Sequence, residues 1–188
     1  TQYSTIAEAV EAAKSGDEID LLRNATSGNT LLDVPSTKNV IFDLNGYTLK
    51  STGTSPVVNN NGTLTIKNSK SSTQTAVLNS TSTSGYTIKN NGTLTLQTGI
   101  NVESSYKGIY NDTSGCLTIN GTTINATNMG IESVSTKINT SSASSGNAVY
   151  IYGNTKITSE NSNCIYNNSS GKVIISNGTY NQTSGGSS

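Results

Sequence analysis

A short alternation of apolar and polar residues recurs along almost the whole chain, and this repeat constrains the fold more than any other feature. Most neighbouring copies lie about 22 to 24 residues apart, and two intervals are longer by roughly one loop. Short runs with a period of two predict β-strands, and a fixed spacing of this length predicts one structural unit per repeat. The copies are Ile19-Asp20-Leu21, Phe42-Asp43-Leu44, Leu64-Thr65-Ile66, Leu94-Thr95-Leu96, Leu117-Thr118-Ile119, Val149-Tyr150-Ile151 and Val173-Ile174-Ile175.

A second pattern precedes five of these strands. An aliphatic residue and an Asn or Ser stand two positions apart, so both lie on the same face of a strand. If the units stack, the Asn side chains form a row at one corner, where each amide can bond to its neighbours and to backbone groups. The five segments are Val58-Asn59-Asn60, Ile88-Lys89-Asn90, Ile109-Tyr110-Asn111, Ile131-Glu132-Ser133 and Ile165-Tyr166-Asn167.

A turn and a third short strand follow the alternation. Asn-Gly pairs such as Asn45-Gly46 and Asn120-Gly121 accept the positive φ that a sharp corner requires. Each unit is therefore a coil of three short strands, which becomes stable only when the next coil stacks on it. We predict an all-β, single-stranded parallel β-helix (solenoid) of about seven coils, as a domain over residues 1–182. The third strands open at Leu49, Val102, Ile124, Ile157 and Tyr180.

The first residues predict a helix instead of a strand. Ser4 or Thr5 can cap a short helix over about residues 4–15, and Gly16 is expected to end it. An amphipathic helix in this position would cover the apolar end of the stack. The apolar positions at helical spacing are Ile6, Ala9, Val10 and Ala13.

Two insertions and a tail interrupt the repeat. Residues 67–75 and 140–146 are predicted loops at corners, which serve either as binding surfaces or as tolerated excursions. Residues 183–188 are rich in Gly and Ser and predict a flexible tail.

Composition agrees with a thin solenoid and excludes several classes of function. Only 31% of the residues are hydrophobic and 12% are charged, whereas globular domains draw nearly half and about a quarter of their residues from these groups. The net charge is zero, so we expect no nucleic-acid partner. No run of apolar residues is long enough for a transmembrane helix, so we expect no membrane insertion.

The chemistry of the side chains argues against an enzyme. The chain contains no His, which removes the Ser-His-Asp and Cys-His nucleophile systems and most transition-metal sites. The acidic residues are expected on different coils and faces, and Asp17, Glu18 and Asp20 diverge along one strand. Asp112 and Glu132 are the best pair for glycoside hydrolysis, although solvated surface acids are the simpler interpretation. We therefore expect no catalytic residue, no cofactor and no metal.

One outward row could bind carbohydrate. Stacking would place Tyr110 and Tyr166 about 10 Å apart with Glu132 between them, next to Lys89 and Asn59. Aromatic rings can pack against the apolar face of a sugar, while polar groups bond to its hydroxyls. Tyr110, Glu132 and Tyr166 are thus candidate carbohydrate-contact residues. The alternative is that Tyr is simply a good strand former and that the charges keep this face soluble.

Two further features carry weaker hypotheses. Five threonines could form a regular hydroxyl array of the kind that orders ice, namely Thr63, Thr65, Thr93, Thr95 and Thr118. Cys116 and Cys164 fall about two coils apart, so we expect free buried thiols, with a bond between chains as the alternative.

The opening segments resemble a known group of proteins. The segments 3–10, 16–19 and 40–49, followed by the Asn-Gly-Thr-Leu-Thr-Ile coils, are similar to right-handed parallel β-helix domains of secreted bacterial surface proteins. These are adhesin-like members of the pectin-lyase-like superfamily. The resemblance implies a right-handed helix at the cell surface, acting as a spacer, a binding surface or a filament subunit. The lyases of this superfamily use an acidic calcium cluster with basic residues, and this sequence departs from that pattern.

The expected function combines these observations. It is a non-catalytic, extracellular structural or adhesive module that could self-associate through its solenoid ends, assemble into a filament, or bind a glycan or host-surface ligand. The alternative is a carbohydrate-binding or polysaccharide-degrading β-helix protein.

Overall fold

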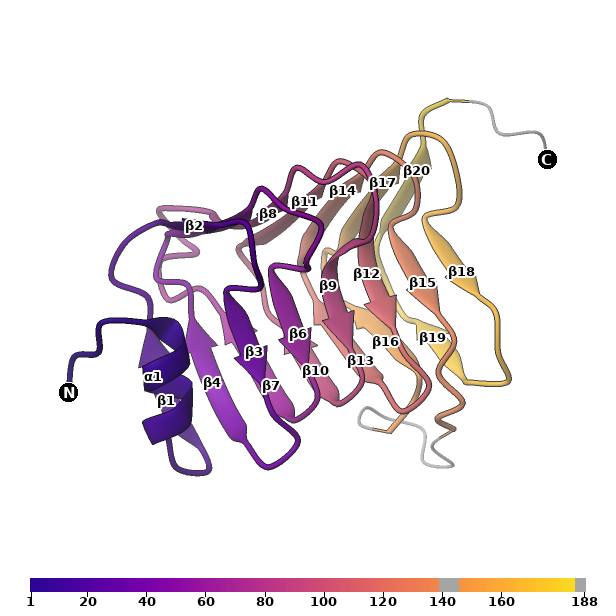
Figure 1. The fold of residues 1–188 in the computed structure, drawn as a ribbon. Coiled ribbons are helices and arrows are strands. Elements are labelled where there is room, and N and C mark those ends of the chain that lie inside the picture. Colours follow the sequence, from indigo (N-terminus) through magenta and orange to yellow (C-terminus); the bar gives the residue numbers. More distant parts are fainter. Residues whose placement is uncertain (139–145, 185–188) are drawn as a thin grey trace.

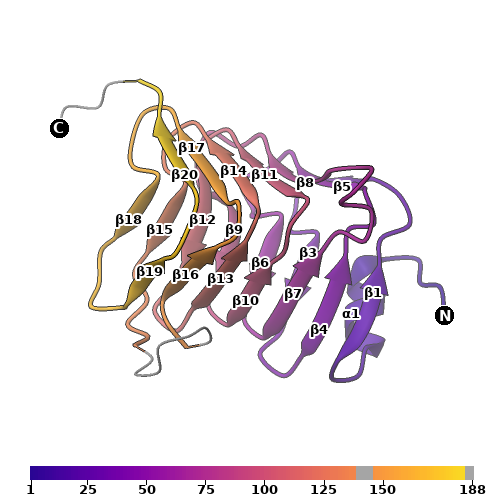
Figure 2. The same ribbon diagram turned by 180° about the vertical axis from the view of Figure 1, so that it is seen from behind.

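The computed structural model describes residues 1–138 and 146–184, and these residues form a parallel β-helix solenoid (Figure 1). The strands build three parallel sheets that run along the solenoid, as the view from behind also shows (Figure 2). In the described residues two sheets contain seven strands and the third contains six. The predicted stack of about seven coils is therefore confirmed.

Each coil adds one strand to each sheet in turn. Sheet A contains β1 (Asp17–Asp20), β4 (Asn39–Asp43), β7 (Thr63–Lys67), β10 (Thr93–Leu96), β13 (Cys116–Asn120), β16 (Val149–Tyr152) and β19 (Val173–Ile175). Sheet B contains β2 (Ala25–Ser27), β5 (Thr48–Ser51), β8 (Ala76–Ser80), β11 (Ile100–Ser104), β14 (Thr123–Ala126), β17 (Lys156–Ser159) and β20 (Thr179–Gln182). Sheet C contains β3 (Leu32–Val34), β6 (Val58–Asn60), β9 (Tyr86–Asn90), β12 (Lys107–Asn111), β15 (Ile131–Ser133) and β18 (Ile165–Asn167).

The core is a column of aliphatic side chains along the solenoid axis. Leu94 pairs in register with Leu64 on one side and Leu117 on the other. Ile88 pairs with Ile109 in sheet C, and all five side chains are buried. Each such side chain contributes roughly 1.5–3 kcal/mol when it leaves water. Because every coil needs only a few of them, a chain with 31% hydrophobic residues suffices.

Buried polar side chains form a ladder beside this column. Asn60 donates through Nδ2 to Asn90 Oδ1 at 2.8 Å, and Asn90 donates to Asn111 Oδ1 at 2.8 Å. Asn111 continues the ladder to Ser133 Oγ at 3.3 Å and also donates to the carbonyl of Ala148 at 2.7 Å. The amides thus satisfy one another and the backbone at the corner, which confirms the predicted Asn row.

The corner after β4 shows how the turns are built. Asn45 and Gly46 have φ angles of 48° and 81°, in the region that favours these two residue types. Asp43 Oδ1 accepts from the Asn45 amide at 2.7 Å, which is an Asx-type contact that holds the turn. Gly46 donates to Asn68 Oδ1 on the next coil at 2.9 Å. The Asn-Gly corner therefore links two coils.

The N-terminal helix is shorter than expected. Helix α1 (Ile6–Ala12) has Thr5 as its N-cap and a capping box with Glu8. The expectation that Gly16 ends it is wrong, because Ala13 is already extended. Gly16 has φ +86° and donates to the Asn39 carbonyl at 2.8 Å, so it belongs to the turn into β1.

Helix α1 packs beside β3, where sheet C would need another strand (Figure 1). Val10 joins the aliphatic core, and Ile6 and Ala13 pack against it. Lys38 Nζ donates to the Ala13 carbonyl at 3.0 Å and fastens the end of the helix. The helix therefore covers part of the N-terminal end of the stack.

The insertions and the tail are described in part. The first insertion forms turns between β7 and β8, where Asn68 donates to the Gln74 and Gly99 carbonyls. Residues 140–145 of the second insertion lie outside the described residues, as do residues 185–188 of the tail. The first tail residues, Thr183 and Ser184, donate backbone bonds to the carbonyls of Ser159 and Glu160.

Candidate functional site

The outward row of sheet C carries the residues that the sequence singled out. Tyr110 pairs in register with Lys89 on one side and with Glu132 on the other, and Glu132 pairs with Tyr166. Asn59 precedes Lys89 in the same row. The predicted row is confirmed, with Glu132 between the two tyrosines.

The structure places three further residues beside this row, which the sequence did not indicate. The rings of Tyr86 and Tyr110 stack with centroids 4.6 Å apart and planes 27° apart. Lys107, the register partner of Tyr86, places Nζ 5.4 Å from the ring centres of both Tyr86 and Tyr106. We call these side chains the tyrosine platform. Its members are Tyr86, Tyr106, Lys107, Tyr110, Glu132 and Tyr166.

Strict alternation would place Tyr86 inside the solenoid. In β9 both Thr87 and Ile88 are buried, so the first residue of the strand is displaced to the surface. Strand β12 repeats this pattern, with Gly108 and Ile109 buried and Lys107 outside. A period of two therefore fails at the start of these strands, which is why the sequence pattern missed Tyr86 and Lys107.

Glu132 organises the charged part of the platform. Its Oε2 accepts from Lys107 Nζ at 2.9 Å and from the Tyr86 hydroxyl at 3.1 Å. Burial, followed by the negative charge of Glu132, raises the pKa of Tyr86, so this phenol stays neutral and continues to donate. Burial and the nearby Asp112 likewise raise the pKa of Tyr110. The ion pair is about four-fifths buried on both sides, with side-chain exposures of 18% and 17%.

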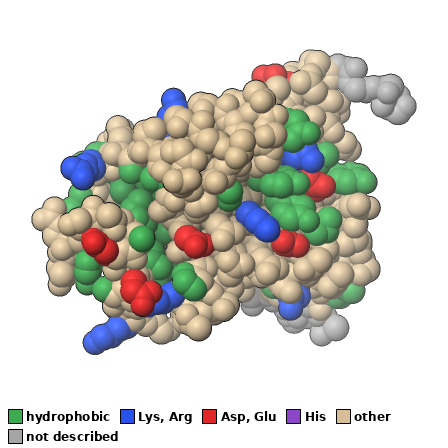
Figure 3. Space-filling model, viewed as in Figure 1, with side chains coloured by type: hydrophobic (Ala, Val, Ile, Leu, Met, Phe, Trp, Pro, Cys, Tyr) green, Lys and Arg blue, Asp and Glu red, His purple; other side chains and the backbone are tan. Residues whose placement is uncertain are grey.

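The platform lies on one side of the molecule near its C-terminal coils. Figure 3 shows hydrophobic side chains gathered there beside basic and acidic ones, over β12, β15 and β18. Tyr166 is 39% exposed, and the other platform residues are half-buried. A ligand could therefore reach the edges and part of the faces of these rings.

Asp112 and Glu132, the pair suggested for glycoside hydrolysis, each form an ion pair with a different lysine. Asp112 binds Lys89 with Oδ2 and Nζ 3.6 Å apart, whereas Glu132 binds Lys107. Each carboxylate thus has its own lysine partner.

The expectation that the acidic residues are scattered is wrong at the N-terminal end. The carboxylate oxygens of Glu18, Asp20 and Asp43 lie within 4.8 Å of one another. The reason is register, because Asp20 and Asp43 are direct partners across β1 and β4, and Glu18 lies two residues before Asp20 on the same face. Lys67 supplies the balancing charge, 2.8 Å from Glu18 and 3.7 Å from Asp43.

The pKa values of Asp43 and Asp20 are shifted in opposite directions. Burial would raise the pKa of Asp43, but backbone hydrogen bonds from Ser69 and Asn45, together with Lys67, hold it below the ordinary value. The pKa of Asp20 is raised, first by burial and then by the neighbouring charges of Glu18 and Asp43. We call Glu18, Asp20, Asp43 and Lys67 the acidic clamp. In this cluster the Lys67 ammonium group supplies the positive charge beside the carboxylates.

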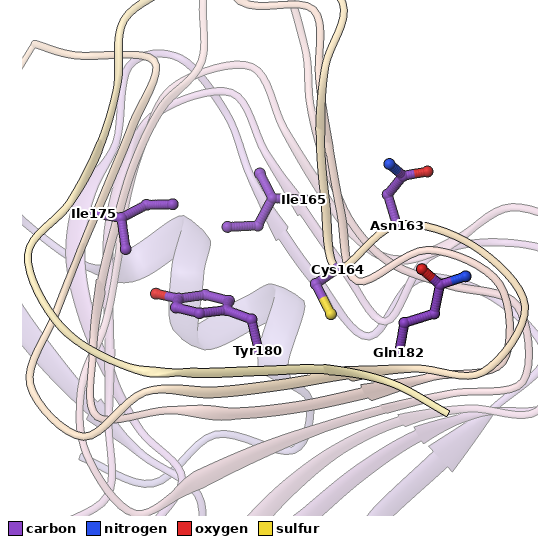
Figure 4. Close-up of a pocket in the computed structure, with 6 residues that line it drawn as sticks. All are labelled: Asn163, Cys164, Ile165, Ile175, Tyr180 and Gln182. Atoms are coloured by element: carbon purple, nitrogen blue, oxygen red, sulfur yellow. The ribbon is translucent and has the colours of Figure 1, made fainter. Parts of the chain in front are cut away.

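The C-terminal end of the solenoid has a hollow of about 300 Å³. Its walls come from the last coil, and Ile165, Ile175 and Tyr180 point toward the centre of that coil (Figure 4). Ile175 is 49% exposed although its register partner Ile151 is fully buried. The hollow is lined by Asn163, Cys164, Ile165, Ile175, Tyr180 and Gln182.

The remaining candidates are the threonine row and the two cysteines. Thr65 stacks on Thr95 and Thr95 on Thr118, but the row continues to Ile41 and Tyr150, which limits the hydroxyl array to three coils. Cys116 and Cys164 are free thiols, and burial raises the pKa of both. A high thiol pKa makes them poor nucleophiles near neutral pH.

Comparison with known proteins identified no relative of this chain. A scan against models of protein families, a search of curated proteins and a search of solved structures each found no match. No helix in the described part of the chain is both long and apolar enough to cross a membrane.

Proposed function

We propose that the chain is a non-catalytic, extracellular structural and adhesive module of a bacterial cell surface, and that it associates through the C-terminal end of its solenoid. The sequence resemblance to adhesin-like members of the pectin-lyase-like superfamily supports the location and the class. A stack of coils joined by three continuous hydrogen-bonded ladders is also a suitable spacer, because its length and direction are fixed.

The observation that carries this proposal is the difference between the two ends of the stack. At the C-terminal end, the outer edges of β18, β19 and β20 pair with no strand among residues 1–138 and 146–184. Ile175 and the neighbouring Ile165 leave apolar surface at this end. Unpaired strand edges that carry apolar side chains tend to pair with another chain.

The opposite end carries features that discourage such pairing. Helix α1 covers the edge of β3, and the edge strand β1 exposes Asp17, Glu18 and Asp20. Charged residues on an edge strand oppose addition of another strand. Contact between two C-terminal ends would give a closed pair, whereas contact between unlike ends would give a filament.

A concentration series tests the association. Light scattering and negative-stain microscopy of the purified chain should show a mass above 19.5 kDa that rises with concentration. Ile175→Lys should abolish the rise because it puts a charge on the apolar end. Ile174→Lys is the matched control, since Ile174 lies on the same strand but pairs with the outward Tyr150. A mass of 19.5 kDa at every concentration would refute the association.

The non-catalytic part of the proposal has its own test. The separate lysine partners of Asp112 and Glu132 support it, because hydrolysis needs two carboxyls that act on one bond. Release of reducing ends or of unsaturated products from a panel of plant, fungal and bacterial polysaccharides would overturn it.

A second candidate function is carbohydrate binding. The stacked rings of Tyr86 and Tyr110 beside the Lys107–Glu132 pair favour it. This function is compatible with an adhesive module.

A further inference from the structure

The charges on the tyrosine platform are paired within the protein, and this narrows what the platform could bind. Lys107 is bound to Glu132 at 2.9 Å, and Lys89 is bound to Asp112 at 3.6 Å. A polyanion would find no unpaired cation in these two pairs and would approach two carboxylates. The local charge therefore favours an uncharged ligand.

We propose that the tyrosine platform binds a neutral oligosaccharide, whose rings pack on Tyr110 and Tyr166 and whose hydroxyl groups bond to Glu132 and Lys107. This inference rests on the proposed adhesive function and specifies its ligand. The platform shares β18 with the association surface through Tyr166, but Ile175 is not part of the platform, so the two proposals are tested by different variants and different measurements.

The spacing of the platform suits consecutive sugar rings. Tyr110 and Tyr166 occupy one outward row two coils apart, so their positions differ by about 10 Å along the solenoid. Glu132 occupies the position between them. An extended glycan lying along the solenoid axis would meet an aromatic ring, a carboxylate and a second ring in that order.

The side chains match the two kinds of surface that a neutral sugar presents. A pyranose has an apolar face of C–H groups, which packs against an aromatic ring, and polar edges of hydroxyl groups. Glu132 can accept from such hydroxyls, and Lys107 can donate to them. Hydrogen bonds with one charged partner are stronger than neutral ones, so this pair can fix the orientation of a sugar that is itself uncharged.

The platform is already held in place before a ligand arrives. Tyr86 supports Tyr110 through the stacked rings and anchors Glu132 through its hydroxyl. Lys107 is fixed by Glu132 and by the two rings within 5.4 Å. Fixed side chains lose little conformational entropy on binding, which favours affinity for a small ligand.

Direct binding measurements test the proposal. Neutral cello-, xylo-, manno- and chito-oligosaccharides are compared with oligogalacturonates by calorimetry and on a glycan array. At least one neutral series should bind more tightly than the acidic one, with little dependence on salt, because no ion pair forms with the ligand. Tyr110→Ala combined with Tyr166→Ala should weaken binding about tenfold or more.

The control variants separate recognition from folding. Tyr150→Ala removes one ring of the other stacked pair, Tyr150 and Tyr152, whose centroids are 5.1 Å apart in sheet A. It should leave binding unchanged. Tyr110→Phe with Tyr166→Phe keeps both rings and should retain binding, so it remains informative if the double alanine variant fails to fold.

Three results would overturn the proposal. They are no binding of any neutral oligosaccharide, tighter binding of oligogalacturonates that falls with salt, and neutral binding that survives the double alanine variant in a folded protein. If a protein binds the platform and no neutral oligosaccharide does, the proposal is likewise overturned. None of these results changes the concentration series with Ile175→Lys, so failure of the two proposals can be distinguished.

Discussion

Asn90 donates through Nδ2 to Asn111 Oδ1 at 2.8 Å, and both side chains are fully buried beside the aliphatic column. Asn90 also accepts from Asn60 at 2.8 Å, so the Asn90 amide acts as both donor and acceptor within the ladder. A buried ladder of this kind penalises any shift in register, because a shift would leave several amides unpaired at once. It therefore specifies how coils stack, whereas the apolar column supplies most of the driving force.

Replacing Asn90 by Ala should lower the free energy of unfolding by about 2–4 kcal/mol. The substitution leaves Asn111 Oδ1 without this donor and opens space in a close-packed corner. Urea unfolding followed by circular dichroism measures the change. Asn59→Ala is the matched control, because Asn59 lies on the outward face of the neighbouring strand and its side chain donates to the exposed Asp33 at 2.8 Å. Equal effects of the two variants would contradict the ladder.

Leu94→Ala should lower the free energy of unfolding by about 2–5 kcal/mol, which is the range for truncation of a buried Leu whose site cannot collapse. Leu94 lies between Leu64 and Leu117, so the cavity interrupts the column in the middle of the stack. Thr95→Ala, on the outward side of the same strand, should change stability by less than about 0.5 kcal/mol. Similar unfolding curves for both variants would show that this column does not form.

Asp43 should make stability depend on pH. Its pKa is lowered in the folded state, so its contribution is fully present above the unfolded value of about 3.9 and is lost as the pH falls through the lower folded pKa. Asp43→Asn should therefore be less stable than the wild type near neutral pH, by about 1–2 kcal/mol, and the difference should shrink in acid. Unfolding free energies of both proteins across the acid range measure this.

Asp20 should act in the opposite sense and provides the control for Asp43. Its pKa is raised in the folded state, so its charge opposes folding above that pKa and this cost disappears in acid. Asp20→Asn should be more stable than the wild type near neutral pH, with a difference that also vanishes at low pH. Two variants that shift stability in the same direction would contradict the assigned acidic clamp.

Glu132→Gln should lower the pKa of Tyr86 toward its ordinary value of about 10. The negative charge of Glu132 is one cause of the raised pKa, after burial, so the shift should decrease but not disappear. Residue-resolved NMR titration of the tyrosine rings gives the value. Glu103→Gln, which removes a carboxylate bound to Asn125 in sheet B, should leave Tyr86 unchanged.

The fold was largely predictable because each coil repeats the same short sequence patterns. The alternation around Leu94 and Leu117, the Asn at positions 90 and 111, and the Asn-Gly corner at 45–46 each predicted their place in a coil. Register then followed from aligning these patterns, since most neighbouring coils have nearly the same length and the two insertions lie between the aligned strands. The row through Tyr110, Glu132 and Tyr166 was predictable for the same reason.

Other features depend on departures from the repeat. Tyr86 and Lys107 reach the surface because two consecutive residues are buried in β9 and in β12, which a period of two does not allow. The acidic clamp forms because Asp20 pairs with Asp43, and Asp43 with Lys67, on neighbouring coils. The positions of these residues in the sequence did not indicate that they would meet. Helix α1 ends early because the Gly16 turn is needed to enter β1.

Association through one end of the solenoid is the central structural claim, and hydrogen–deuterium exchange at low and high protein concentration tests it most directly. Amides that enter an interface exchange more slowly, and the method locates them on individual strands. The account predicts that protection rises with concentration in β18, β19 and β20, that α1 and the central strands do not change, and that Ile175→Lys removes the effect. Exchange in these three strands that is the same at both concentrations would contradict it.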